Sequence, residues 1–330
     1  MPQTFQDLIA QNKRTSVMLV AVFVLFIAAM AITLALAVLV MMDPERAAAI
    51  QIKRGLAVGA VAAVISFGIS LLSYFSGDQL ILGVQGAHEL KKADDPQLFN
   101  VVEEMAIAGG LPMPKIYLID DPSPNAFATG RDPEHASVAI TTGLRSKLNR
   151  EELQGVMAHE MSHIRNYDIR LMLLLAVLIG TVTMLSDFFW SVLRFGPRGG
   201  SSSNNSSSSD GDKKGGAQLL MIVVLVLAVL FSILAPLLAS MLQFAVSRQR
   251  EYLADATGVE LTRNPVGLAH ALEKLNADPT PMHILNRGTA HLFIVNPIKK
   301  FANLGDTIFA SHPPIETRIQ RLYSLIQPTK

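Results

Sequence analysis

Cysteine is absent from this 330-residue sequence, which excludes disulfides, thiolate metal ligands and cysteine nucleophiles. A metal ion would therefore have to be held by histidines and carboxylates. Charged residues are also scarce: they make up 17% of the chain, and the formal net charge is +1. Without a concentrated basic face, the chain has no electrostatic basis for binding nucleic acid. Soluble domains usually contain about 25% charged residues, so the composition favours a membrane protein.

Four long hydrophobic stretches are present: residues 17–42, 55–77, 171–186 and 215–247. About 20 helical residues span the roughly 30 Å hydrocarbon core of a bilayer, and the first, second and fourth stretches exceed this length. The third stretch meets Asp187, and it either continues beyond this residue or only dips into the membrane. A buried helix is the alternative for any one of them. We predict a mostly α-helical integral membrane protein that crosses the lipid bilayer with about four transmembrane helices.

These stretches divide the chain into four segments. Residues 1–77 are predicted to form an N-terminal membrane hairpin, and residues 171–247 a second one. Residues 78–170 and 248–330 would then lie on the same side of the membrane and could assemble into one domain. Residues 199–216 are rich in Gly, Ser and Asn, and we expect a disordered loop because they cannot bury enough apolar surface. Lysine and arginine are balanced between the two sides, so charge does not decide the orientation.

The first part of this domain has the pattern of an α+β fold. Residues 115–119, 125–129 and 137–141 are rich in β-formers, and the last two flank a polar connection. This arrangement predicts a small antiparallel hairpin, and we expect the domain to carry a small antiparallel sheet. Asn149 is followed three residues later by Glu152, which resembles a capping box at the start of the next helix.

That helix contains the sequence His-Glu-Met-Ser-His, with histidines at 159 and 163 and Glu160 between them. Residues four apart lie on one helix face, so His159 and His163 can direct both imidazoles at one metal ion. Zinc suits this pattern because it takes three protein ligands and keeps a fourth position for water. Glu160 could then accept a proton from that water. Two surface histidines on an ordinary helix are the alternative interpretation.

A third ligand has to be a histidine or a carboxylate, and Glu251 is a candidate because it directly follows the last hydrophobic stretch. Asp255 lies four residues later on the same helix face. The glutamate could bind zinc while the aspartate accepts a hydrogen bond from a ligand imidazole and determines its tautomer. The alternative is the solvated start of a helix, with Arg248 and Arg250 as ion-pair partners.

Several motifs in a common order carry a resemblance that covers nearly the whole chain. They are residues 125–130 (NAFATG), 159–163 (HEMSH), 247–255 (SRQREYLAD), 291–297 (HLFIVNP) and 311–318 (SHPPIETR). With these motifs the sequence resembles the HtpX family of bacterial membrane zinc metalloproteases, relatives of the CAAX prenyl endopeptidases. Residues 199–216 are not part of the shared pattern.

The resemblance implies a zincin-like α+β catalytic domain that holds one zinc ion per chain. It implies His159, His163 and Glu251 as the zinc ligands and Glu160 as the general base. It also implies a multi-pass protein of the bacterial inner membrane whose catalytic domain faces the cytoplasm and degrades damaged or misfolded membrane proteins. The sequence does not indicate an oligomeric state.

Two further roles follow from the resemblance and have a physical rationale. The strand at Asn125, Ala126 and Phe127 could offer an open edge to an extended peptide and bind it through main-chain hydrogen bonds. His312 and Arg318 could donate hydrogen bonds to the oxyanion of the tetrahedral intermediate. The alternatives are ordinary sheet structure for the strand, and a helix-starting turn with a structural ion pair for His312 and Arg318.

Three alternative functions are considered for this sequence. An intramembrane protease is disfavoured because charged residues flank the His-Glu-x-x-His motif. A membrane-anchored holdase stabilised by zinc is the main alternative, and Glu160 discriminates because a structural site needs no carboxylate between its ligands. A transporter is a third possibility, because Asp187 lies at membrane depth and charged residues there are functional candidates.

Overall fold

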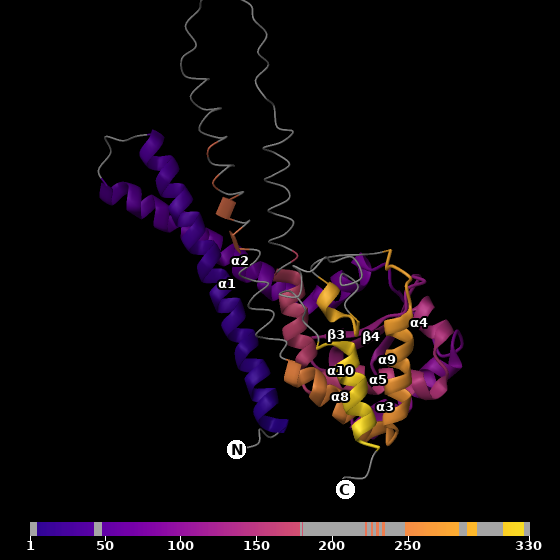
Figure 1. The fold of residues 1–330 in the computed structure, drawn as a ribbon. Coiled ribbons are helices and arrows are strands. Elements are labelled where there is room, and N and C mark those ends of the chain that lie inside the picture. The colour runs from indigo at the N-terminus through magenta and orange to yellow at the C-terminus, as the bar shows by residue number, and fades with distance from the viewer. Residues whose placement is uncertain are drawn as a thin grey trace, which may run out of the picture. The chain divides into compact units, whose positions relative to one another are not determined.

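The computed structural model describes residues 5–42, 48–178, 180, 222, 226, 229–230, 233–234, 248–283, 289–295 and 313–326. In this part of the chain helices predominate and the strands form one sheet (Figure 1). The helices are α1 (Phe5–Met42), α2 (Ala48–Val84), α3 (Pro96–Gly109), α4 (Thr142–Lys147), α5 (Arg150–Arg165), α8 (Arg248–Thr262), α9 (Pro265–Ala277) and α10 (Ile315–Ser324), with the 3₁₀ turns η1 (Pro133–His135) and η2 (Ala290–Leu292). The strands are β1 (His88–Glu89), β2 (Lys115–Ile119), β3 (Ala126–Gly130) and β4 (Ala136–Thr141).

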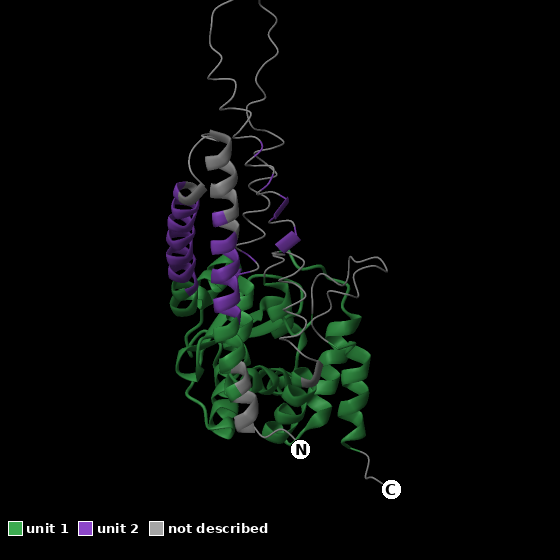
Figure 2. Cartoon of the chain, turned by 90° about the vertical axis from the view of Figure 1, so that its left-hand side faces the viewer, with its two compact units in different colours: residues 1–18, 71–177, 239–330 green, residues 19–70, 178–238 purple. Residues whose placement is uncertain are grey.

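The chain divides into two compact units (Figure 2). Unit 1 contains residues 1–18, 71–177 and 239–330, and unit 2 contains residues 19–70 and 178–238. Residues 78–170 and 248–330, which are predicted to assemble into one domain, both belong to unit 1. The sheet and the helices from α3 onward lie in this unit.

The first two hydrophobic stretches lie within α1 and α2. Among the described residues, one helical stretch is long and apolar enough to cross a membrane, namely Ile52–Val84 of α2. Four transmembrane helices therefore remain a prediction. Residues 179 and 181–186 of the third stretch, most of residues 215–247, all of residues 199–216 and Asp187 lie outside the described residues.

The sheet is mixed, with the strand order β1-β2-β4-β3. The predicted hairpin is confirmed, since β3 and β4 are antiparallel with Ala126 opposite Ile140 and Gly130 opposite Ala136. The expected small antiparallel sheet is instead mixed, because β2 pairs with β4 in parallel. β4 inserts between β2 and β3, which follow each other in the chain, and alternation within single strands cannot reveal that order.

Both faces of the sheet are buried. On one face, side chains of alternate residues such as Ile116, Val138 and Ile140 join a core with α3, α5 and α9. On the other face, Ile119 and Phe127 pack with residues of the end of α2 and of segment 172–177. The hydrophobic β4 fits this position between two apolar layers.

Helix α5 is the central helix of unit 1, packed against α3, α8, α9 and β3 (Figure 1). It begins with the predicted capping box: Asn149 Oδ1 accepts from Glu152 N (2.9 Å), and Glu152 Oε2 accepts from Asn149 N (2.8 Å). These bonds satisfy two backbone donors that a helix start leaves unpaired. The helix start is thus defined locally, while its buried remainder depends on neighbouring helices.

The close crossing of α5 and α9 depends on Gly155. A β-carbon there would lie 2.6 Å from the backbone N of Leu268 and 2.8 Å from its Cα. Relieving this clash would require a backbone shift, which costs free energy. We expect Gly155→Ala to lower the free energy of unfolding by about 1–3 kcal/mol. Denaturant unfolding of the detergent-solubilised protein measures this change. Gly83→Ala is the matched control, because that helical position faces open space. Alanine there should raise the free energy of unfolding by about 0.5–1 kcal/mol. Equal changes in the free energy of unfolding of both variants would contradict the packing argument.

Candidate metal centre

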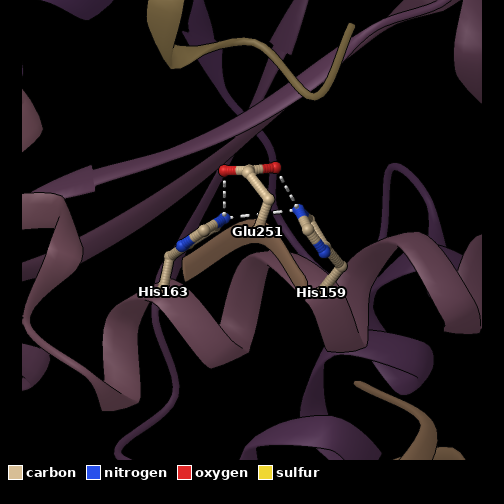
Figure 3. A group of neighbouring side chains, drawn as sticks. All are labelled: His159, His163 and Glu251. Carbon is tan, nitrogen blue, oxygen red and sulfur yellow. Dashed lines mark hydrogen bonds and ion pairs between the residues drawn. The ribbon is translucent and has the colours of Figure 1, made fainter. Parts of the chain in front are cut away.

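Two histidines of α5 and one glutamate of α8 converge inside unit 1 (Figure 3). The Nε2 atoms of His159 and His163 are 3.2 Å apart. The Glu251 carboxylate lies across them, with one oxygen 3.7 Å from each Nε2. All three side chains are buried, and Glu251 is fully inaccessible to solvent. Three candidate ligands are therefore brought together from segments that lie almost 90 residues apart in the chain.

His159 is held from behind by a carboxylate and an arginine. Its Nδ1 lies 3.0 Å from Asp255 Oδ1, as expected for a carboxylate that determines the imidazole tautomer. Arg318 of α10 donates to both Asp255 oxygens, from Nε at 2.9 Å and from Nη2 at 2.7 Å. Asp255 thus lies where the helical spacing from Glu251 predicts, and Arg318 is its bidentate partner.

His163 has an equivalent pair of partners that the sequence analysis missed. Its Nδ1 lies 3.1 Å from Asp168 Oδ2, and Arg250 Nη1 donates to Asp168 Oδ1 at 3.2 Å. Asp168 follows the end of α5, where helical spacing no longer predicts neighbours. The sequence offered one signal for this contact, namely that Asp168 is an acidic residue only five positions after His163.

The charges around the two histidines act on them differently. Burial, together with the Arg318 guanidinium, lowers the pKa of His159 to about 4. Burial would also lower the pKa of His163, but the hydrogen bond to Asp168 and the nearby Glu251 carboxylate outweigh it and raise the pKa to about 9. Burial would raise the pKa of Asp255, yet Arg318 and His159 hold it at about 2. Asp255 is therefore ionised at neutral pH.

Glu160 lies beside the candidate ligands and is buried. Burial raises the pKa of its carboxyl group to about 7, and the neighbouring Glu251 carboxylate adds to the increase. The backbone of Ala128 in β3 hydrogen-bonds to this carboxylate. A carboxyl group with a pKa near neutrality can both accept and release a proton under physiological conditions.

The donor set fits zinc. Two nitrogens bound tetrahedrally to zinc at 2.0–2.1 Å are about 3.3 Å apart, close to the 3.2 Å between the two Nε2 atoms. Both Nδ1 atoms face carboxylates, so each ring in its neutral form directs an Nε2 lone pair inward, and a cation between the rings would take the place of the proton that His163 otherwise binds. The described site also holds four carboxylates (Glu160, Asp168, Glu251, Asp255) against the guanidiniums of Arg250 and Arg318. A divalent cation in place of the His163 proton would offset the negative charge of these carboxylates.

The structure gives a partial view of the remaining predicted site residues. Arg318 is 1% exposed, and Nη1 donates to the Ile294 carbonyl at 3.3 Å in addition to the bonds with Asp255. Its guanidinium is therefore engaged in holding neighbouring groups, and its role toward an oxyanion remains a prediction. His312 lies outside the described residues.

The predicted peptide-binding edge is partly engaged by the chain itself. β3 is an edge strand, but the Ala126 carbonyl accepts from Ile294 N at 3.0 Å. The Asn125 side chain donates from Nδ2 to Val295 O at 2.8 Å, and its Oδ1 accepts from Val295 N at 3.3 Å. Phe127 is buried and packs edge-on against a second phenylalanine. A peptide pairing with β3 would meet residues 294–295 at the Ala126 end of the strand.

Comparison with known proteins defines the class to which this fold and site belong. Residues 92–326 match the family described as "Peptidase family M48". The match includes both histidines, Glu160 and Glu251, so the buried cluster lies within a peptidase domain.

Curated relatives agree over most of the chain. The "Protease HtpX homolog" of Thermoanaerobacter pseudethanolicus is 44% identical over 254 residues, covering 77% of this chain and 80% of the relative. That of Levilactobacillus brevis is 43% identical over 270 residues, covering 79% and 84%. The crystal structure of S. mikatae Ste24p aligns with a TM-score of 0.47 at 20% identity, covering 78% of this chain and 57% of that one. The chain belongs to peptidase family M48 and, within it, to the HtpX proteases.

Proposed function

We propose that this protease is a zinc-dependent endopeptidase of the bacterial inner membrane that hydrolyses peptide bonds of misfolded or damaged membrane proteins. The convergence of His159, His163 and Glu251, with the Glu160 carboxylate beside them, is the observation that carries the proposal. Membership of a peptidase family supports hydrolysis rather than a structural metal site.

His159, His163 and Glu251 would hold one zinc ion, which acts as a Lewis acid that acidifies water and polarises the peptide carbonyl. Glu160 takes the proton from the attacking water and passes it to the leaving amine. Asp255, held by Arg318, keeps the His159 ring oriented throughout.

The proposed location and substrates rest on the membrane-like composition and on the relatives. α2 contains an apolar stretch long enough to span a bilayer. The resemblance to the HtpX family, and not the charge distribution, is the basis for a catalytic domain that faces the cytoplasm. Binding of an extended peptide along β3 would tolerate many sequences, because main-chain hydrogen bonds do not distinguish side chains.

Removal of the metal tests this function directly. We expect detergent-purified protein to contain about one zinc per chain and to cleave an unfolded substrate such as casein. Dialysis against a chelator should abolish cleavage, and stoichiometric zinc should restore it. Metal analysis and gel-based cleavage measure both steps. Zinc binding that suppresses aggregation without any cleavage would instead support the holdase.

A further inference from the structure

The buried pair formed by Asp168 and Arg250 is not used by the reaction as derived above, yet it lies directly behind the candidate ligand His163. Asp168 and Arg250 side chains are 6% and 12% exposed. Their contact joins residues 82 positions apart in the sequence. A buried charge pair in this position can act on the ring of His163.

Asp168 lies where a carboxylate can determine which nitrogen of His163 is available. Nδ1 of His163 faces Asp168 Oδ2 at 3.1 Å, while Nε2 faces His159 and Glu251. A carboxylate accepting from Nδ1–H leaves the Nε2 lone pair free for a metal and restricts rotation of the ring. The same contact makes the imidazole a stronger donor.

The chain reaches this position through an unusual turn. α5 ends at Arg165, and Tyr167 then adopts the left-handed conformation with φ 59°. Such a conformation is unfavourable for a residue with a β-carbon and persists where the surrounding structure requires it. Here the turn directs the chain back so that Asp168, five residues after His163, lies against its ring.

Arg250 connects this turn to the other half of the centre. It donates to Asp168 Oδ1 and directly precedes Glu251 in the first turn of α8. The pair therefore links the orientation of His163 to the position of the third candidate ligand. The carboxylate and arginine behind His159, Asp255 and Arg318, form the same arrangement on the other side.

We propose that Asp168 and Arg250 act as a positioning pair that orients His163 and holds the start of α8, so that Nε2 of His163 and the Glu251 carboxylate meet at one metal ion. This inference rests on the proposed zinc site. It adds two residues that touch neither the ion nor the substrate.

Metal affinity of the full-length, detergent-solubilised protein tests the pair. Loss of such a partner typically weakens metal binding about 10–100-fold, so we expect Asp168→Asn to show this loss in competition with a chromophoric chelator. The absorption spectrum of the Co²⁺-substituted variant should also change, because it reports ligand geometry, which a general loss of stability would not alter. Arg250→Gln should weaken binding in the same direction, and the double variant should lose little more than Asp168→Asn because the residues act as one unit.

Asp95→Asn is the matched control, since it breaks the ion pair of a partly buried aspartate with Arg145 away from the centre and asparagine still caps a helix. This control should bind metal like wild type. Arg250→Gln tests the pair even if Asp168→Asn does not fold. Wild-type affinity and an unchanged cobalt spectrum in folded Asp168→Asn or Arg250→Gln would overturn the positioning role alone. A wild-type protein that binds no metal would overturn the zinc site and this inference together.

Discussion

Glu160→Gln should retain metal and lose cleavage. Glutamine has the shape of glutamate but cannot accept a proton, so the step assigned to a general base is removed while the three candidate ligands remain. General acid–base catalysis contributes about 10²–10⁴-fold, and we expect kcat to fall by at least this factor. Burial disfavours the charged form of this side chain, so we expect the neutral glutamine to be accommodated in its place.

The experiment compares metal content and casein cleavage of wild type and Glu160→Gln. The backbone hydrogen bond from Ala128 can still be accepted by the amide oxygen, so the variant should fold. Glu151→Gln serves as a control because Glu151 is an exposed residue of the same helix. Unchanged cleavage by Glu160→Gln would show that another group is the base, whereas equal loss in Glu151→Gln would indicate a general defect of α5.

Glu251→Ala should lose metal and cleavage together. The carboxylate supplies the only candidate ligand outside α5 among the described residues. Loss of a residue that merely orients a ligand costs about 10–100-fold in metal affinity, so loss of the ligand itself should exceed ~100-fold. Equilibrium dialysis against zinc buffers and the cleavage assay measure the two effects.

Glu251 is fully buried, so alanine leaves a cavity as well as removing the ligand. Glu251→Gln keeps the volume and should also bind zinc much more weakly, because a neutral amide is a poor zinc ligand. Glu260→Ala, at an exposed position of the same helix, should behave like wild type. Full zinc occupancy in folded Glu251→Gln under chelator challenge would assign the third ligand elsewhere.

Local sequence patterns predicted the parts of the site that lie on one helix. His159 and His163 are four residues apart, and the capping box at Asn149 marks where their helix begins. Glu251 and Asp255 were likewise related by helical spacing, and both face the histidines. Such predictions succeed because the helical repeat fixes the relative direction of nearby side chains.

Other features could not be read from the sequence. The parallel pairing of β2 with β4 depends on which strand occupies the middle of the sheet. The engagement of the β3 edge by residues 294–295 joins segments about 170 positions apart. Neither has a periodic signature, because the partners are selected by packing of the whole unit.

The sequence by itself determined the absence of thiolate chemistry, the apolar stretches, the start of α5 and the facing histidines, since each depends on composition or on neighbours within one or two helical turns. Only the tertiary structure decided that Asp168 and Arg250 lie behind His163, that Arg318 holds Asp255, and that α8 brings Glu251 to α5. The Asp168–His163 contact spans five residues and depends on the left-handed turn at Tyr167. The other contacts close long loops, and their formation depends on burial shared among several elements rather than on any local preference of the chain.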